Sequence, residues 1–229
     1  MTVFSCRSHV DVLTINILLP FAFLYKFMHI ILMVFFIYIL LRMWQKIAKY
    51  GRKLVERHLV ESNFGNISLR AGDKMLITRT GAALDEITAN KVIEVDIQDT
   101  SVLDMIASSE SVVHREIYRQ TFALAIIHAH CEYSVVESLL EGPAGIILPV
   151  DSEGQYFIRD IPIVEGNIGS RKLADNLANA LSRRRGAIVY GHGTFAIGET
   201  LGDAYIVTTQ LEHSCKIKYL YELASSERK

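Results

Sequence analysis

The sequence has few cysteines, few prolines and little net charge. Its 229 residues include 3 cysteines and 4 prolines, and the formal net charge is −1 at pH 7. The cysteines, Cys6, Cys131 and Cys215, form no CxxC pair and are odd in number, which excludes a disulfide framework and favours a reducing compartment. A generic phosphate-backbone binder would be strongly basic, so the composition argues against a nucleic-acid partner.

The first 42 residues differ sharply in composition from the rest. They are strongly apolar and carry a net charge of +2, whereas residues 43–229 carry −3 and have the composition of a soluble domain. A membrane anchor is one interpretation, although the apolar run Phe27–Leu41, broken only by His29, is shorter than the roughly 20 residues of a spanning helix. A signal peptide is disfavoured, because no small-x-small cleavage site follows the run.

A third interpretation is that translation begins at Met43. From there the chain opens like a cytoplasmic protein, with an amphipathic helix in its first residues. We favour this interpretation and expect a cytoplasmic protein, with a membrane-anchored protein as the alternative. An intact mass that includes residues 1–42 would contradict it.

Residues 43–229 contain both helical and strand-like patterns, with no repeats or low-complexity tracts. Helices are expected over Ile47–Val60, Ser111–Gln120, Glu132–Leu140, Ser170–Arg185 and Leu201–Leu223. Strands are expected over Ile67–Arg70, Met75–Thr78, Val92–Asp96, Ala123–Ala129, Ile146–Val150, Tyr156–Ile158, Ala187–Tyr190 and Thr194–Ile197. Such a mixture indicates one α/β domain with a central sheet and helices on its faces. The Arg183–Arg185 run is expected to be a solvated helix end, favoured by the helix dipole.

Three histidines are the strongest chemical signal. His128 and His130 lie at the end of an apolar strand, and side chains at i and i+2 of a strand point to the same face, so both can reach one metal ion. His192, between two glycines, is the third candidate, and catalytic zinc sites usually have three protein ligands. The competing interpretation is two histidines capping a strand and a third in a turn. His58 and His213 are expected to be packing or surface residues.

Three polar turns could bind an anion or could be only turns and caps. Ser108-Ser109-Glu110 precedes a helix, where free backbone N–H groups and hydroxyls can hold a phosphate. The same segment can equally form an N-cap arrangement. Gly65-Asn66 and Thr80-Gly81 carry the same ambiguity.

Taken together, residues 43–229 resemble the class II aldolase/adducin family, most of all its fuculose-phosphate aldolase type. The matching elements, in order, are Gly65-Asn66-Ile67-Ser68, the Thr80-Gly81 loop followed by Leu84, Ser108-Ser109-Glu110 with His114 and Ile117-Tyr118, His128-Ala129-His130, and Gly191-His192-Gly193. Each element alone is unspecific. Five of them in this order, with similar spacing, make a specific signal.

The resemblance implies a three-layer α/β/α sandwich around a mainly antiparallel central sheet. The implied ligands of one zinc ion per subunit are His128, His130, His192 and Glu110. Glu110 is also the implied acid/base. The residues implied to hold the phosphate of dihydroxyacetone phosphate are Gly65, Asn66, Thr80, Gly81, Ser108 and Ser109. The implied reaction is reversible cleavage of L-fuculose 1-phosphate, or a similar ketose 1-phosphate, to dihydroxyacetone phosphate and L-lactaldehyde in a homotetramer.

The chemistry of that reaction agrees with these residues. A divalent ion can act as a Lewis acid on the enediolate, and no lysine for a Schiff base lies inside the motifs. A carboxylate beside the metal can move the proton at C3. In the aldolases that this chain resembles, tyrosines of a neighbouring subunit assist. Tyr156 is a candidate for that role here, with a plain packing role as the alternative, so the second proton donor stays unassigned.

Other members of the family leave alternatives open. Methylthioribulose-1-phosphate dehydratases also use a glutamate and three histidines. Ribulose-phosphate 4-epimerases carry aspartate where Glu110 stands, so the glutamate favours an aldolase. A non-catalytic adducin-like module would be expected to lose the zinc histidines, and all three are present.

Overall fold

The computed structural model describes residues 27–28 and 42–226 of the chain. The chain divides into two units, Met1–Arg42 and Met43–Lys229, of which the second carries the fold. The segment 1–42 lies almost entirely outside the described residues, so an anchor or a start at Met43 stays a prediction. Among the described residues, no helix has the length and apolar character needed to span a membrane.

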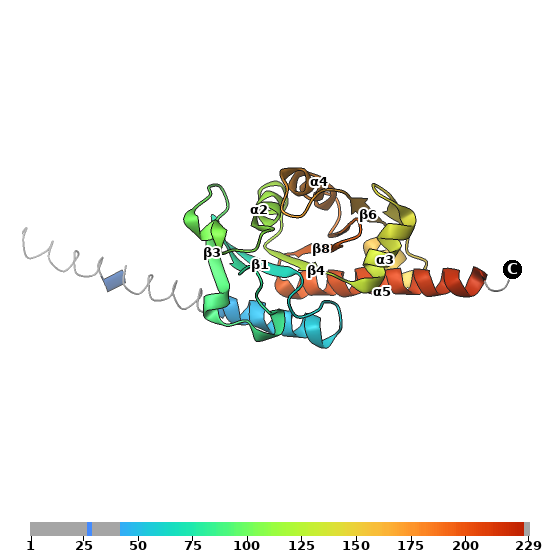
Figure 1. Cartoon of the computed structure of the whole chain (residues 1–229), viewed down its shortest axis with the longest axis horizontal. Coiled ribbons are helices and arrows are strands. Elements are labelled where there is room, and N and C mark those ends of the chain that lie inside the picture. Colours follow the sequence, from blue (N-terminus) through green and yellow to red (C-terminus); the bar gives the residue numbers. More distant parts are fainter. Residues whose placement is uncertain (1–26, 29–41, 227–229) are drawn as a thin grey trace, which may run out of the picture. The chain divides into compact units, whose positions relative to one another are not determined.

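A mixed sheet forms the centre of the second unit, with eight strands among the described residues (Figure 1). The strands are β1 (Asn66–Ala71), β2 (Lys74–Thr78), β3 (Val92–Asp96), β4 (Ala125–Ala129), β5 (Ile146–Ile147), β6 (Ile161–Val164), β7 (Gly186–Val189) and β8 (Gly193–Gly198). Their order is β3-β2-β1-β4-β8-β7-β6-β5, and only the β6–β7 pair is parallel. The sheet is therefore mainly antiparallel, as expected, and β4 lies near its centre.

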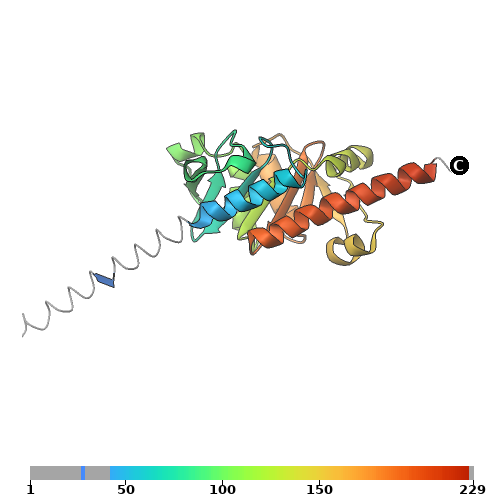
Figure 2. The same ribbon diagram turned by 90° about the horizontal axis from the view of Figure 1, so that it is seen from below.

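Helices cover both faces of the sheet. The helices are α2 (Ser111–Gln120), α3 (Glu132–Glu141), α4 (Arg171–Leu181), α5 (Leu201–Ser226) and a helix through residues 43–56. Short 3-10 turns occupy Leu84–Glu86, Ala89–Lys91 and Val102–Met105. Helices α2 and α4 lie on one face, and Figure 2 shows α5 and the helix through residues 43–56 side by side across the other. The expected three-layer sandwich is confirmed.

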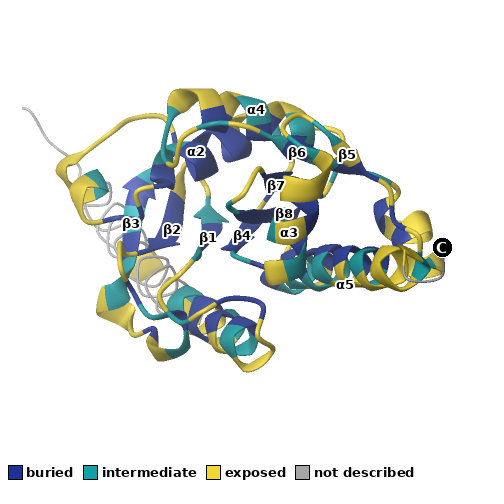
Figure 3. Ribbon diagram, turned by 45° about the vertical axis from the view of Figure 1, so that its right-hand side comes forward, coloured by how far each residue is buried: buried dark blue, intermediate teal, exposed yellow. Residues whose placement is uncertain are grey.

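The alternation of side chains along the strands divides the core into two layers. Ile126 of β4 and Phe195 of β8 are buried in the layer that contains α2 and α4. Ile188 of β7 is buried with Leu211 of α5 in the other layer. Figure 3 shows the burial concentrated on the strands and on the helix surfaces that face them. Because side chains two apart share a face, position 128 belongs to the same layer as Ile126.

Several elements differ from the sequence-based expectation. The expected strand Tyr156–Ile158 is wrong, because these residues belong to a π-helical turn, Gly154–Ile158. Strand β6 was not expected, since it contains Pro162, which removes a backbone donor and argues against a strand. Helix α4 is capped by Ser170, whose hydroxyl accepts from the Leu173 N–H, but it ends at Leu181. The arginine run therefore lies beyond the helix, in the connection to β7, and the helix-end interpretation is wrong.

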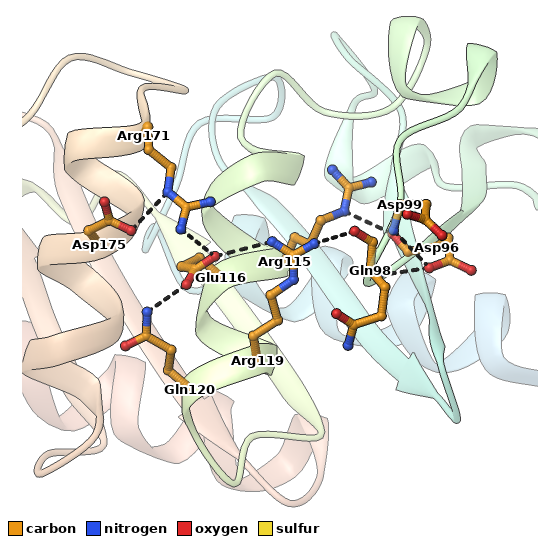
Figure 4. Close-up of polar contacts among 9 residues, drawn as sticks. All are labelled: Asp96, Gln98, Asp99, Arg115, Glu116, Arg119, Gln120, Arg171 and Asp175. Atoms are coloured by element: carbon orange, nitrogen blue, oxygen red, sulfur yellow. Dashed lines mark hydrogen bonds and ion pairs between the residues drawn. The ribbon is translucent and has the colours of Figure 1, made fainter.

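The outward side of α2 is held by polar contacts between the buried Arg115 and Glu116 and their neighbours (Figure 4). Glu116 accepts hydrogen bonds from Arg119 and Gln120 and forms an ion pair of 3.1 Å with Arg171 of α4. Arg115 Nε donates to the Asp96 carbonyl at the end of β3. These contacts tie α2 to α4 and to the edge of the sheet. We call this set the outer network: Arg115, Glu116, Arg119, Gln120 and Arg171.

Candidate functional site

Three histidines meet at one end of the sheet. His128 is in β4, His130 directly follows that strand, and His192 lies in the turn between β7 and β8. One ligand nitrogen from each lies within 4.8 Å of the others. The three ring centroids are 4.6, 4.7 and 4.8 Å apart. The pairing of β4 with β8 brings a distant turn to the two histidines of one strand.

Backbone and aromatic contacts fix the orientation of His128. Its Nδ1 lies 2.9 Å from the Thr194 carbonyl oxygen, which can only accept, so Nδ1 carries the proton. Nε2 therefore keeps its lone pair, and it lies 3.0 Å from His130 Nε2. The Phe195 ring stacks on the His128 ring at 4.3 Å. A hydrogen bond from the second ring nitrogen to a carbonyl is the usual support of a metal-binding histidine.

A buried carboxylate completes the cluster. Glu110 immediately precedes α2 and is 3% exposed. Its Oε2 accepts a hydrogen bond of 2.9 Å from Asn66 Nδ2 and lies 3.1 Å from His128 Nε2. Its Oε1 has no hydrogen-bond partner within the described part of the chain. Asn66 of β1 thus orients Oε2 of Glu110, while Oε1 is not engaged by a hydrogen bond and can take part in proton transfer.

Burial sets the protonation of this cluster. It lowers the pKa of His128 to about 4, that of His130 to about 3 and that of His192 to about 4. The imidazoles are therefore neutral at pH 7, the state that binds metal. Burial raises the pKa of Glu110, against the opposing effects of the Asn66 hydrogen bond and the nearby imidazoles.

These donors fit a divalent metal ion. Zinc bonds of about 2.0–2.2 Å in tetrahedral geometry place neighbouring ligand atoms roughly 3.3 Å apart. The distances from His128 Nε2 to His130 Nε2 and to Glu110 Oε2, 3.0 and 3.1 Å, are close to that spacing. The Phe64 ring stacks on His130 with centroids 5.3 Å apart and restrains the second ring. Imidazoles with a carboxylate suit zinc and several other divalent ions.

The six residues expected to hold a phosphate lie in three turns near this cluster. Because β1 and β2 are antiparallel, Gly65-Asn66 at the start of β1 and Thr80-Gly81 after β2 lie at the same end of the two strands. The Thr80 hydroxyl donates to the Ala107 carbonyl, and the Ser108 N–H donates to the Thr78 carbonyl. The structure therefore brings Ser108-Ser109 beside the Thr80-Gly81 turn. Ser109 and Thr80 are exposed, whereas Ser108 is buried.

Gly65 is required by its surroundings. Its φ is 81°, in the left-handed region that side-chain-bearing residues rarely adopt. A Cβ at this position would lie 2.3 Å from the carbonyl oxygen of His128. Only glycine lets the turn before β1 approach the histidine strand this closely.

A buried polar seam between α2 and β1 supports the site, and sequence reasoning assigned no role to three of its members, Ser68, His114 and Tyr118. Ser68 Oγ lies 2.7 Å from both His114 Nδ1 and Tyr118 Oη, and all three residues are at most 1% exposed. Together with the Glu110–Asn66 contact, they form a row of hydrogen bonds along one side of α2. The spacing of four residues could have predicted that Glu110, His114 and Tyr118 share one side of the helix, but not that β1 supplies their partners. We call this set the inner seam: Asn66, Ser68, Glu110, His114 and Tyr118.

Helix α3 positions the turn that carries His192. Ser138 Oγ accepts a hydrogen bond of 3.0 Å from the Gly191 N–H. The start of α3 is in turn held by Glu212 of α5, whose carboxylate accepts from the N–H groups of Tyr133 and Ser134 at 2.9 Å each. These residues belong to no motif, so no pattern in the sequence pointed to them.

A cavity of about 490 Å³ opens beside His130 and His192. It is also lined by His58, which is exposed, as expected, and has a φ of 54°. His213 is exposed on α5, also as expected. Tyr156 does not line this cavity; it is 75% exposed and lines a different one. Within one subunit, the site therefore receives no tyrosine from the 154–158 turn.

Known proteins share this fold and are 26–33% identical to this chain over the aligned residues. A model of the class II aldolase and adducin N-terminal domain matches residues 45–219. The L-fuculose phosphate aldolase of Methanocaldococcus jannaschii is 33% identical over 179 residues, which cover 77% of this chain and 95% of that protein. The crystal structure of L-fuculose-1-phosphate aldolase from Thermus thermophilus has a TM-score of 0.75 and 32% identity, covering 81% of this chain and 96% of that one. The 3-oxo-tetronate 4-phosphate decarboxylase of Haemophilus influenzae is 26% identical, covering 74% of this chain and 83% of that protein.

Proposed function

We propose that this chain, which belongs to the class II aldolase and adducin family, catalyses metal-dependent, reversible cleavage of L-fuculose 1-phosphate or a similar ketose 1-phosphate. The products would be dihydroxyacetone phosphate and L-lactaldehyde. The observation that carries the proposal is the convergence of three imidazole nitrogens and one buried carboxylate at the end of β4. The similarity to fuculose-phosphate aldolases supports this substrate class.

In this proposal His128, His130 and His192 hold one zinc ion, and Glu110 is the fourth ligand at rest. When bound, the ion supplies Lewis-acid stabilisation of the negative charge that carbon–carbon cleavage leaves on the ketose-derived fragment. The neutral imidazoles and the hydrogen bond from His128 to the Thr194 carbonyl favour such binding. The chain provides no lysine in the motifs for a Schiff base, so charge stabilisation is assigned to this centre.

Glu110 moves the proton at C3 of the fragment that becomes dihydroxyacetone phosphate. Its Oε2 is held by Asn66, and Oε1 is the oxygen that we assign to proton transfer. Burial raises the pKa of this carboxyl above its ordinary value, which suits a group that must both take and return a proton.

The phosphate of the substrate is held by hydroxyls and backbone N–H groups at three turns. The residues assigned to it are Gly65, Asn66, Thr80, Gly81, Ser108 and Ser109. Ser108 and Ser109 lie at the start of the ten-residue helix α2, where the unpaired N–H groups and the helix dipole favour an anion. Because Glu110 follows these serines directly, phosphate binding places C3 near the carboxylate.

The proposal includes a homotetramer in the cytoplasm. The enzymes that the sequence resembles work as homotetramers, and Tyr156 stays a candidate proton donor only if it acts on a neighbouring subunit. Light scattering of the purified protein at several concentrations would test the assembly, and a stable monomer with full activity would contradict it.

The test is an assay of dihydroxyacetone phosphate release from L-fuculose 1-phosphate by full-length protein purified without chelator. Cleavage that EDTA abolishes and zinc restores is the expected result, with about one metal ion per chain by elemental analysis. Bound metal without cleavage would contradict the substrate and would direct the assay to dehydration of methylthioribulose 1-phosphate. The absence of both bound metal and cleavage would contradict the enzyme assignment itself.

A further inference from the structure

A second cavity lies at the opposite end of the strands that carry the histidines. Its volume is about 510 Å³, and it is lined by Phe122 before β4, by residues 156–160 before β6 and by residues 182–186 before β7. His130 and His192 follow the other ends of β4 and β7, and His128 lies in β4 close to that end. The five residue steps from Arg185 to Tyr190 along β7 correspond to roughly 16 Å at about 3.3 Å per residue. The cavity is therefore separate from the candidate active site.

The lining of this cavity is strongly basic. It contains four arginines and a single carboxylate, that of Asp160. Arg184 binds both oxygens of that carboxylate through Nε and Nη2. The guanidinium groups of the other three have no ion-pair or hydrogen-bond partner in the described part of the chain; they are Arg159, Arg183 and Arg185. Since residues 43–229 carry a net charge of −3, this concentration of positive charge is opposite in sign to the unit that bears it.

Aromatic rings stand beside these arginines. Phe122, Tyr156 and Phe157 all line the cavity and are 55%, 75% and 59% exposed. The rings of Tyr156 and Phe157 are perpendicular, with centroids 4.8 Å apart. Three exposed aromatic side chains in one cavity exceed what an inert surface requires, and their faces can stack on a planar ring.

The backbone at the edge of the cavity is strained. Arg159 has a φ of 72° and a ψ of −68°, although it carries a long side chain. Its N–H donates to the Gly154 carbonyl at 2.8 Å and closes the π-helical turn. Outliers of this kind, and π-helical turns in general, occur often at functional sites. Here the turn brings Arg159 and two aromatic residues into the same lining.

We propose that this cavity is a second binding site, for a phosphorylated small molecule that carries a planar ring, of the nucleoside diphosphate class. Arg159, Arg183 and Arg185 bind the phosphate oxygens as forked donors, and Arg184 stays paired with Asp160. Tyr156 and Phe157 contact the ring. A volume of about 510 Å³ lies within the usual range for such ligands, roughly 300–1,000 Å³. The site shares no residue with the histidine cluster, and Tyr156 is the one lining residue that the aldolase proposal also uses, as a candidate proton donor to a neighbouring subunit.

The test is calorimetric titration of the full-length protein with ADP and, separately, with inorganic pyrophosphate. We expect saturable binding of both probes, weakened about tenfold or more when Arg183→Ala and Arg185→Ala are combined, because two charge-assisted contacts are lost. The matched control combines Lys46→Ala and Arg52→Ala, which remove two exposed positive charges from the helix through residues 43–56. That control should leave both affinities within about twofold of wild type.

Two further variants assign the ligand's parts and exclude the metal site. Tyr156→Ala should weaken ADP but not pyrophosphate, because only ADP has a ring to stack. His128→Ala should leave both affinities unchanged. No saturable binding, an equal loss in both double variants, or a loss confined to His128→Ala would each overturn the proposal. Binding of a poly-glutamate peptide without binding of ADP would also overturn it, since the cavity would then be a protein-docking surface.

Discussion

The polar side chains on the two sides of α2 differ in their burial and in how fully they are hydrogen-bonded. On the side facing β1, the inner seam is buried, and three of its atoms have no partner in the described part of the chain: Asn66 Oδ1, Glu110 Oε1 and His114 Nε2. On the outward side, the outer network has several contacts per group, and the Arg171 side chain is 61% exposed (Figure 4). Helix α2 is thus held on the outward side by many contacts that link the buried Arg115 and Glu116 to exposed partners, and on the side facing β1 by few, enclosed contacts.

The inner seam and the outer network differ in how much they contribute to stability. Polar groups buried without full hydrogen bonding destabilise a core by about 1–3 kcal/mol each, whereas exposed ion pairs contribute about 0–1 kcal/mol. An apolar seam would have been more stable, so we infer that the inner seam is retained because it places Glu110 beside His128. The outer network only adds to the attachment of α2. Four predictions separate these roles, from the largest expected effect to the smallest.

Replacing His192 with alanine should remove the metal and the activity together. Two remaining imidazoles and a carboxylate leave zinc short of its usual ligand number, so affinity and turnover should both fall by roughly two orders of magnitude or more. Elemental analysis and the cleavage assay would check this. His213→Ala, which removes an exposed histidine on α5, is the control and should change neither. Full metal content in the His192 variant would exclude it from the site.

Glu110→Gln should keep the fold and most of the metal but lose turnover. The amide preserves the shape of the side chain and cannot take up the proton, so we expect a fall in kcat of roughly two orders of magnitude, the scale of general acid–base catalysis. Steady-state kinetics with metal quantification would measure it. A kcat within a few-fold of wild type would show that another group moves the proton.

Ser68→Ala should lower stability and kcat with unchanged metal content. It leaves His114 Nδ1 and Tyr118 Oη buried without their shared partner, which costs about 1–3 kcal/mol in urea unfolding. Tyr118→Phe is the matched control, since it keeps the Ser68–His114 contact near Glu110. An equal loss of kcat in Ser68→Ala and Tyr118→Phe would show that the inner seam affects kcat only through the stability of the fold.

Arg171→Ala should have the smallest effect, at most about 1 kcal/mol, with no change in kcat. Burial tends to raise the pKa of Glu116, but hydrogen bonds from Gln120 and Arg119 and the charge of Arg171 lower it overall. Because the folded pKa is the lower one, this carboxylate stabilises the protein above the unfolded value of 4.5, and that contribution is lost as the pH falls below it.

Urea unfolding at pH 7 and at pH 3 would check the last prediction. The difference between wild type and Arg171→Ala should shrink as the pH falls, because protonation of Glu116 removes the charge that pairs with Arg171. A large loss of kcat in this variant would remove the distinction between the two sides of α2.

Most of the architecture was predictable from periodicity. The boundaries of β3 and α2 were predicted correctly, because each has a clean alternation or a clear helical face. The turn Gly154–Ile158 was mistaken for a strand because its apolar end, Tyr156–Ile158, carries no local sign of helical hydrogen bonding. Strand β6 was not predicted, because Pro162 argues against a strand and because β6 forms by tertiary pairing with β7.

The histidine cluster was predictable for a different reason. His128 and His130 are two apart on a strand, and the glycines around His192 indicate a turn. The contacts of the inner seam and the support of α3 by Glu212 were not predictable in the same way, because their partners lie 44 to 79 residues apart in the sequence. Only the three-dimensional packing of α2 beside β1, and of α3 against α5, brings them together.

The position of β4 between β1 and β8 has a consequence for how the molecule opens. Fluctuations that detach an edge, such as the two-residue β5, leave β4 paired on both sides. The amide hydrogens of Ile127 and His128 should therefore exchange with deuterium only through global unfolding, while those of β5 exchange through local opening. A metal centre built on the last strand to open would keep its ligands assembled through every smaller fluctuation of the native state.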